Sequence, residues 1–394
     1  MAYSLNVMKD IIQSYPSWPE LKSFLTSVDG GLLHISDVNK EFCIIRMKHA
    51  PTNTVPHTKW FRSTVWNMET NRPISIAPPK VSTTLPYTTC QELTDAGLFC
   101  QEFVDGFMIN CFKTIASDDV YITSRSKLDA TGHFYSSKSF RELFQEAYAG
   151  DLADLPGPNP MKGEVSISYS FLVQHQEHRV VTPITENKTF LIQKVICMED
   201  GSITVEDNRS DLPDIQIDVS LDVNTWLQQF FSDKTWAYQG VVIKDTAGNR
   251  WRFRNDQYMH VKSLRGNTAN HLERFAQLYV KNATQDYLQY YPLDSFTFVC
   301  NNVFMNMIHQ MVYNNYVQVH ITKTIPMSEV DPLYRRHVYT LHRYYMMVLR
   351  PLKKKITYNE VAAYFFQQPW QTLVYLLRNN QDSYFSQMSE LVSQ

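Results

Sequence analysis

Two arginines near residue 250 carry the clearest chemical signal in the sequence. Arg252 and Arg254 alternate within RWRFR, close after the β-rich run GVVIKD, so a strand would direct both side chains to one face. A guanidinium group holds phosphate through paired hydrogen bonds and stays charged at neutral pH. The pair therefore predicts either a solvated strand face or a site that holds an anion.

Other patterns of catalysis and metal binding are missing from the sequence. It contains no glycine-rich phosphate loop and no recognisable Ser-His-Asp or Cys-His arrangement. Its six cysteines lie far apart, which argues against a zinc site or a disulfide framework and favours a reducing compartment. His175 and His178 have no carboxylate or cysteine at metal-ligand spacing. We therefore expect no metal ion, and we expect both histidines in a surface loop.

The composition is that of a globular protein. The chain has 394 residues, of which 44% are hydrophobic and 19% are charged, so it can form two or three domains with a core. A formal net charge of −2 argues against a wholly basic coat for nucleic acid, although it leaves local patches open. The N-terminus has no signal-like apolar core, and no run of eighteen apolar residues occurs. These features predict a soluble protein of the cytoplasm without a membrane partner.

The predicted secondary structure changes twice along the chain. Residues 1–40 are predicted as an N-terminal helical segment, because Ser17 can cap a helix with Pro19 in its first turn. Residues 41–266 consist mainly of short β-rich runs separated by turns, and residues 267–394 show helical spacing. The expected fold class is α+β, with an all-α C-terminal domain.

Helix-start signals support this division. Ser139 and Glu142 form a capping box that predicts a helix at 139–149 inside the β-rich region. Thr357 and Glu360 form a second capping box before the apolar run VAAYFF in the C-terminal region.

Four segments of the β-rich region share their order with a known family. They are KWFRSTVWNMETNRPISIAPPK (59–80), FVDGFMINCF with VYITSRSKLDA (103–130), SYSFLVQHQEHRVVTPI (168–184) and YQGVVIKDTAGNRWRFRNDQYMHVKSLRGN (238–267). This succession resembles the covalent nucleotidyltransferase superfamily, specifically the phage-type RNA ligases, over about residues 55–267. The matching positions are Arg62, Asp105, Gly106, Ser124-Arg125-Ser126, Phe171, Arg179-Val180-Val181, Gly240-Val241-Val242 and Tyr258.

The resemblance implies a ligase-type core of twisted antiparallel sheets, with an all-α domain after it. It also implies a nucleotide pocket, and the proteins it suggests are those encoded by large DNA viruses. Taken alone, Asp105-Gly106 is equally the signature of a simple β-hairpin turn.

The chain departs from the family at the residues that perform the chemistry. The family's nucleophilic lysine stands two residues before Asp-Gly, where this chain has Phe103, and a phenyl ring cannot attack a phosphorus atom. Leu172 and Gln239 occupy two glutamate positions, so a divalent cation would lose hard anionic ligands. Arg252 and Arg254 replace the paired lysines. We therefore predict no catalytic residue and a remnant pocket at Arg62, Phe103, Asp105, Gly106, Phe171, Leu172, Gln239, Arg252 and Arg254.

The segment YRRHVYTLHRYYMMVLRPLKKK (334–355) is basic and rich in tyrosine. Leu333, His337, Leu341, Tyr344 and Val348 fall at spacings of three and four, which predicts an amphipathic helix with a basic outer face. Such a helix suits nucleic acid, or it is an ordinary solvated helix. The residues predicted to bind nucleic acid are Arg125, Arg179, Arg335, Arg336, Arg343, Lys353, Lys354 and Lys355.

Three functions follow from these features. The first is a catalytically inactive RNA-ligase-like protein that binds RNA or assembles with a protein partner and needs no cofactor. The second is an active ATP- and Mg²⁺-dependent ligase with a substitute lysine such as Lys80 or Lys113. The third is a purely structural component, for instance of a virion, whose pocket is filled by side chains.

Overall fold

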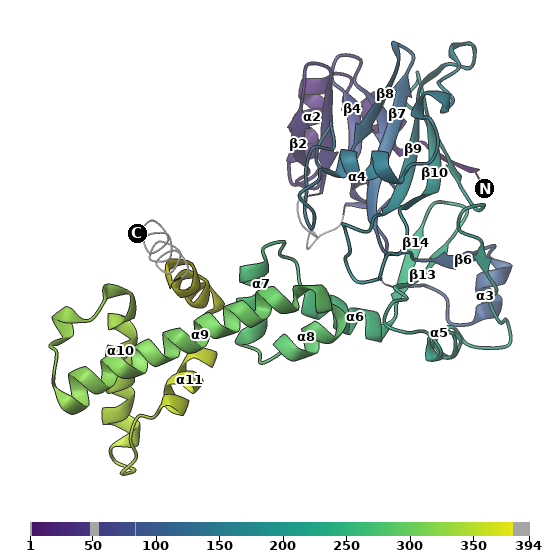
Figure 1. The fold of residues 1–394 in the computed structure, drawn as a ribbon. Coiled ribbons are helices and arrows are strands. Elements are labelled where there is room, and N and C mark those ends of the chain that lie inside the picture. Colours follow the sequence, from purple (N-terminus) through teal and green to yellow (C-terminus); the bar gives the residue numbers. More distant parts are fainter. Residues whose placement is uncertain (1, 48–54, 83, 381–394) are drawn as a thin grey trace. The chain divides into compact units, whose positions relative to one another are not determined.

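The computed structural model describes residues 2–47, 55–82 and 84–380, in two compact units, Met1–His260 and Val261–Gln394 (Figure 1). The first unit combines antiparallel sheets with short helices, and the second unit is helical. The predicted α+β class, with helices after the sheets, is confirmed. The boundary between the units falls inside helix α6 (Asp256–Arg265).

Sheet A is a six-stranded antiparallel sheet with the strand order β1-β11-β10-β9-β7-β8. Its strands are β1 (Ala2–Leu5), β7 (Phe107–Thr114), β8 (Ser117–Thr123), β9 (Glu164–Gln174), β10 (Lys188–Met198) and β11 (Ile203–Asp207). The long strands β9 and β10 form its centre, and β1 brings the N-terminus to its edge by pairing with β11.

Two four-stranded antiparallel sheets complete the first unit. Sheet B has the order β2-β3-β4-β5, with β2 (His34–Val38), β3 (Phe42–Arg46), β4 (Thr64–Asn67) and β5 (Arg72–Ile76). Sheet C has the order β12-β6-β13-β14, with β6 (Phe99–Glu102), β12 (Asp214–Ile215), β13 (Gly240–Lys244) and β14 (Arg250–Arg254). Strand β5 contacts β9 and β10, so sheet B packs on sheet A.

Four of the five helices described in the first unit begin at a capping residue, and the exception is the first one. The five helices are α1 (Val7–Ser14), α2 (Trp18–Thr26), α3 (Cys90–Asp95), α4 (Phe140–Ala147) and α5 (Val223–Ser232). The predicted cap Ser17 is present at α2, where it forms a capping box with Glu20, and the predicted capping box of Ser139 with Glu142 is present at α4. Short 3-10 turns lie at Pro56–Trp60, Leu152–Asp154 and Pro160–Lys162. Residues 1–40, expected to be helical, contain α1 and α2 but also strands β1 and β2.

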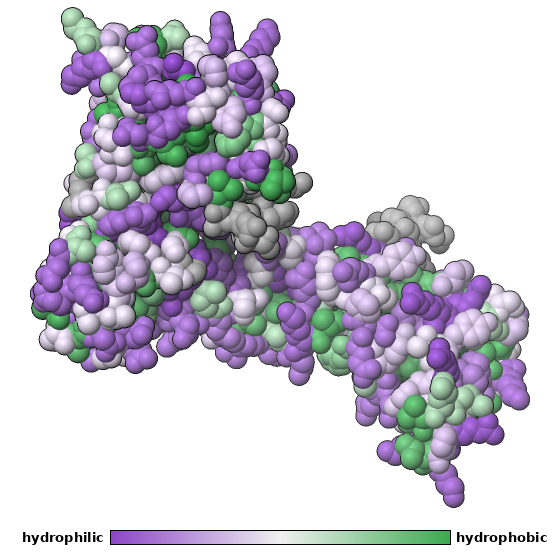
Figure 2. Space-filling view, turned by 180° about the vertical axis from the view of Figure 1, so that it is seen from behind, coloured by the Kyte–Doolittle hydropathy of each residue, from purple (hydrophilic) through white to green (hydrophobic). Residues whose placement is uncertain are grey.

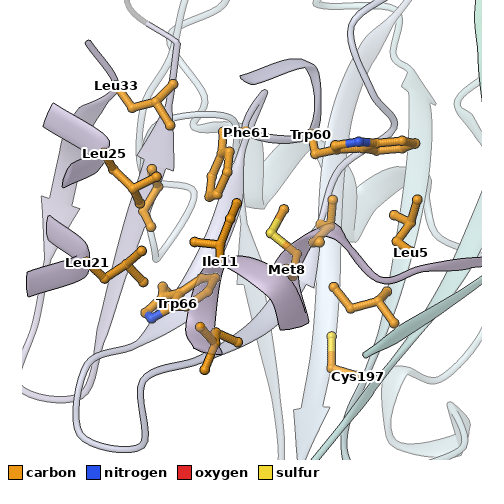
Figure 3. Close-up of a cluster of buried hydrophobic side chains, with 14 of the residues drawn as sticks. Leu5, Met8, Ile11, Leu21, Leu25, Leu33, Trp60, Phe61, Trp66 and Cys197 are labelled. Carbon is orange, nitrogen blue, oxygen red and sulfur yellow. The ribbon is translucent and has the colours of Figure 1, made fainter. Parts of the chain in front are cut away.

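Helices α1 and α2 close one apolar cluster against sheets A and B. Figure 3 shows Met8, Leu21, Leu25, Phe61 and Trp66 directed toward one another in this cluster, and all five are fully buried. Burying one such side chain stabilises the fold by about 2 kcal/mol. The cluster therefore fixes the two N-terminal helices on the sheets.

The second unit is built around the long helix α9 (Ser295–Tyr316), which contacts α7 (His271–Tyr279), α10 (Pro332–Tyr344) and α11 (Tyr358–Phe366). Helix α8 (Thr284–Tyr290) packs on α7, and residues 370–380 form a further helix. Helices α9 and α10 each end in a π-helical segment, Val317–Thr322 and Tyr345–Leu349. Further 3-10 turns lie at Pro292–Asp294 and Met327–Glu329. Within the described parts of the chain, we find no helix with the length and apolar character needed to span a bilayer.

Two histidines are buried in the core of the helical unit. The imidazole of His309 on α9 stacks on the ring of Phe365 at 4.9 Å, and Nδ1 of His337 on α10 lies 2.8 Å from Oη of Tyr364. Burial lowers the pKa of each ring to about 4. Both rings are therefore neutral at physiological pH, and charging them requires the core to open.

We expect the helical unit to lose stability as the pH falls from about 6.5 to about 4. In that window the unfolded chain binds protons that the folded chain does not, so the free energy of unfolding falls, by about 3 kcal/mol per histidine. Hydrogen exchange of α9 and α11 peptides against pH measures this loss. His309→Phe should reduce it, whereas the exposed control His271→Asn should not. An equal loss in wild type and His309→Phe would contradict the assignment.

Candidate functional site

The Asp105-Gly106 turn carries the chain from sheet C to sheet A. The strand before it, β6, belongs to sheet C, and the strand after it, β7, belongs to sheet A. The simple hairpin interpretation of this dipeptide is therefore wrong, because β6 and β7 are not paired with each other.

The buried carboxylate of Asp105 holds this crossing together. Its Oδ2 accepts hydrogen bonds from the backbone N–H groups of Val181 and Thr182 at 2.9 and 3.0 Å, and its Oδ1 accepts one from Oη of Tyr258 at 3.0 Å. The side chain of Gln174 donates to the Asp105 carbonyl oxygen at 2.9 Å. A carboxylate that is 7% exposed needs such partners, and they come from the loop after β9 and from α6.

Glycine is required at two points next to this crossing. A Cβ atom on Gly106 would lie 2.5 Å from the carbonyl oxygen of Val173, and one on Gly240 would lie 2.1 Å from that of Phe253. Neither position can hold a side chain without a shift of the backbone beside it. The Asp-Gly and Gly-Val-Val matches in the sequence are thus explained by close backbone approaches.

Sheet C has one apolar face and one cationic face. Cys100, Val241, Ile243 and Trp251 are buried under α3 and α5. Because side chains alternate along strands, the opposite face carries the residues between them. In register these are Phe99 and Gln101 on β6, Phe103 directly after β6, Val242 and Lys244 on β13, and Arg250, Arg252 and Arg254 on β14.

Phe103 lies on the cationic face at the end nearest the crossing. Its backbone N–H donates to the Gly240 carbonyl oxygen at 2.9 Å. The guanidinium carbons of Arg252 and Arg254 each lie 5.7 Å from the centre of its ring, within cation–π range. The phenyl ring therefore orients both arginines on one face, as the alternation predicted.

Arg62 lies at the point where several arginines converge. Burial, together with the positive charges of Arg250, Arg125 and Arg252, lowers its pKa to about 10. Burial and the charge of Arg125 lower the pKa of Arg46, and burial and the charge of Arg254 lower that of Arg252. The predicted residues Arg62, Arg125, Arg252 and Arg254 thus belong to one group, to which Arg46 and Arg250 are added.

Few carboxylates neutralise this group, which we call the arginine group: Arg46, Arg62, Arg125, Arg250, Arg252 and Arg254. Among the ion pairs of the described residues, none involves Arg46, Arg62, Arg125, Arg252 or Arg254. The Nε atoms of Arg46, Arg250 and Arg254 are buried without a hydrogen-bond acceptor. The arrangement leaves donors and positive charge for an anionic ligand.

One carboxylate supports the far end of the cationic face. Asp207, at the end of β11, accepts a hydrogen bond from Nζ of the buried Lys244 at 3.0 Å, and its charge also favours the protonated form of Arg250. Burial lowers the pKa of Lys244 to about 8, with Arg250 adding to this effect and Asp207 opposing it. Lys244 was not among the predicted site residues, although it shares the alternation of its strand.

Three predicted pocket residues have different surroundings. Leu172 and Gln239 are buried near the crossing, Leu172 in a small cluster with Val104 and Ile192. Phe171, however, is directed to the opposite face of sheet A, where its ring lies 5.5 Å from Phe144 and 5.3 Å from Tyr148. The prediction that Phe171 and Leu172 share the pocket is wrong, because adjacent strand residues point to opposite faces.

The loop after β9 is more buried than the sequence indicated. His175 and His178 are both buried, and the ring of His178 packs against Phe107, Tyr135 and Phe140. The expectation of surface histidines is therefore wrong. Arg179 lies in the same loop, where its Nε donates to the Val181 carbonyl oxygen and its guanidinium lies 5.6 Å from the ring of Trp236.

Glu146, His175 and Glu177 lie close enough together to ligate a metal ion. Nζ of Lys138, however, donates to both carboxylates, at 2.9 Å to Glu146 and 2.7 Å to Glu177. An ammonium group already supplies the positive charge between these carboxylates, so we assign no metal to them.

The two lysines suggested as substitute nucleophiles have different environments. Lys113 lies on the face of β7 that carries Ile109 and Cys111 toward α4, and its Nζ donates to the Ala153 carbonyl oxygen at 2.6 Å. This is the face of sheet A opposite to Leu172. The side chain of Lys80 is exposed just after β5, and its backbone N–H donates to Lys59.

In the helical unit, the predicted cations are mostly exposed. The guanidinium of Arg335 donates to the carbonyl oxygens of Ser328 and Val330, so it holds the turn before α10. Arg336, Arg343 and Lys353–Lys355 are exposed to solvent.

No protein-family model matches the chain, and no curated protein matches it. The solved structures that are similar to it include two ligases. One is a proposed ATP-dependent DNA ligase from Aquifex aeolicus, with 11% identity and a TM-score of 0.34 over 69% of each chain. The other is an archaeal ATP-dependent RNA ligase, with 11% identity and a TM-score of 0.37 over 95% of this chain and 99% of that chain. At these values, the function of the chain has to be inferred from its own residues.

We expect Asp105→Ala to destabilise the first unit by about 3 kcal/mol, because three buried donors lose their acceptor. Asp105→Asn retains one carbonyl oxygen and should cost roughly half as much. Urea unfolding followed by tryptophan fluorescence measures both changes. The exposed control Asp118→Ala should change the stability by less than about 0.5 kcal/mol. A loss no larger for Asp105→Ala than for this control would refute the role of the carboxylate.

Proposed function

We propose that the first unit binds RNA through the arginine group and performs no covalent nucleotide transfer. The observation that carries this proposal is the convergence of Arg62, Arg125 and Arg252 without a neutralising carboxylate. Mutual repulsion of this kind disfavours the empty site, and a phosphate backbone relieves it. A guanidinium is also suited to phosphate because its donors match two oxygen atoms at once.

The absence of covalent chemistry is proposed from the residue at the nucleophile position of the family that the sequence resembles. That position is Phe103, whose ring centre lies 5.7 Å from the guanidinium carbons of both Arg252 and Arg254. Gln239, at a position where the family places a glutamate, contributes no negative charge for a divalent cation. The proposed binding role therefore requires neither ATP nor Mg²⁺.

An active nucleotidyltransferase would need another amine. Lys113 donates to Ala153 on the opposite face of sheet A, which counts against it. Lys244 is the amine whose lowered pKa of about 8 favours nucleophilic attack, but it is buried and paired with Asp207. These contacts favour binding over catalysis.

A role in protein assembly is a second candidate, favoured by the surface of α9. Phe296, Val299 and Val303 are exposed on this helix at spacings of three and four, and the helix carries no charged residue. Apolar helix faces of this kind are typical of contacts between proteins.

We expect Arg252→Gln with Arg254→Gln to weaken binding to single-stranded RNA and to reduce its salt dependence. Each lost phosphate contact should lower the slope of log K against log salt by roughly 0.7. Fluorescence anisotropy with a labelled oligonucleotide over a range of salt concentrations measures both effects in the full chain. Lys40→Gln, an exposed charge at the turn between β2 and β3, is the control and should leave the slope unchanged.

Two results would count against the proposal. Wild-type protein that shows no salt-dependent RNA binding would leave the assembly role as the better candidate. RNA binding with an identical slope in the wild type and the double variant would place the interface away from the arginine group.

A further inference from the structure

The turn that joins α10 to α11 exposes apolar and cationic side chains side by side. We call residues 343–355 the basic tip. Its exposed apolar side chains are Tyr344, Met346, Met347, Val348 and Leu352, and its exposed cations are Arg343, Arg350, Lys353, Lys354 and Lys355. It contains no acidic residue. At the end of the helical unit where α10 leads toward α11 in Figure 1, Figure 2 shows hydrophobic and hydrophilic side chains next to each other.

The exposure of the apolar residues results from the π-helical segment Tyr345–Leu349. The spacing of α10 predicts that Tyr344 and Val348 continue its buried face. The wider π turn shifts this register, so Leu349 is buried instead and Met346, Met347 and Val348 face the solvent. As a result, three consecutive apolar side chains are exposed. In a regular α-helix, at least one of them would be buried in the core.

The loop that follows is held in place by its backbone. The N–H of Arg350 donates to Tyr345, and the N–H of Lys354 donates to Leu349, at 2.8 and 2.9 Å. Buried Leu349 and Ile356 anchor the two ends of the loop. Leu352, which is 61% exposed, is therefore presented by a folded turn.

We propose that the basic tip docks on the surface of an anionic lipid membrane. Five cations without an acid complement a negatively charged headgroup layer. The aliphatic side chains of Met347 and Leu352 have no use in a nucleic-acid site, which offers phosphates and base planes. In the boundary region between headgroups and acyl chains, the same side chains are transferred out of water, which favours binding.

This mode of binding differs from the crossing of a membrane. A short apolar surface bordered by lysines lies in the interfacial layer and needs no spanning helix. The expectation of no membrane partner was based on the missing spanning segment, which an interfacial contact does not require. The proposal is independent of the RNA-binding proposal, because the basic tip and the arginine group belong to different units.

Flotation of the full chain with phosphatidylcholine vesicles, with and without phosphatidylserine, tests the proposal. We expect binding only to vesicles that contain phosphatidylserine. Lys353→Gln, Lys354→Gln and Lys355→Gln together should lower the partition coefficient on the order of a hundredfold. Met347→Ser with Leu352→Ser should also lower it, at unchanged charge.

Matched variants in the same unit separate the basic tip from general surface effects. Lys281→Gln and Leu293→Ser each change an exposed residue outside the basic tip and should float as the wild type does. Circular dichroism checks that all variants are folded. Vesicle binding unchanged by Met347→Ser with Leu352→Ser would overturn the proposal. The proposal would also be overturned if the protein bound RNA through the three lysines and did not bind vesicles.

Discussion

The buried carboxylate of Asp105 is the interaction on which the arrangement of the first unit depends. It accepts hydrogen bonds from two backbone N–H groups of the loop after β9 and from Tyr258 of α6, and thereby fixes the turn between sheets A and C. A charge in this position is costly unless every acceptor site is used. The contacts of this one side chain therefore join three parts of the chain that are remote in sequence, and they place Phe103 and Gly106 on either side of it.

The proposed function rests on the cationic face of sheet C. The other face of sheet C is apolar and is buried under α3 and α5. Because side chains alternate along β14, Arg250, Arg252 and Arg254 all lie on the cationic face. Burial and the repulsion of neighbouring arginines together lower the pKa of Arg62, and the apolar clusters offset this local loss of stability. Proteins retain such unfavourable charge groups mainly where a ligand restores the balance.

Local patterns in the sequence predicted the features that depend on local geometry. The caps of α2 and α4 and the shared face of Arg252 and Arg254 are of this kind. Thr357 also accepts a hydrogen bond from the N–H of Glu360, as its spacing predicted. In each case the relevant atoms lie within four residues of each other.

Local sequence patterns could not predict the features that depend on distant parts of the chain. Strand β1 pairs with residues about two hundred positions away, and no local pattern indicates this pairing. The sequence therefore predicted only helix for the N-terminal segment. Arg46 joins the arginine group through the pairing of sheet B and has no neighbouring signal. The burial of His178 is due to rings from three separate segments. Arg250 and Lys244 could have been predicted, because the alternation that places Arg252 on the cationic face places these two residues there as well.

The most direct test of the central claim is incubation of the full chain with α-labelled ATP or GTP and Mg²⁺ or Mn²⁺, followed by denaturation. We predict no label on the protein, beside a strong signal from an intact ligase, because Phe103 cannot form a bond to phosphorus and Lys244 is paired with Asp207. A labelled band that disappears in Lys80→Met, Lys113→Met or Lys244→Met would contradict the account. It would identify a substitute nucleophile and make the chain an enzyme.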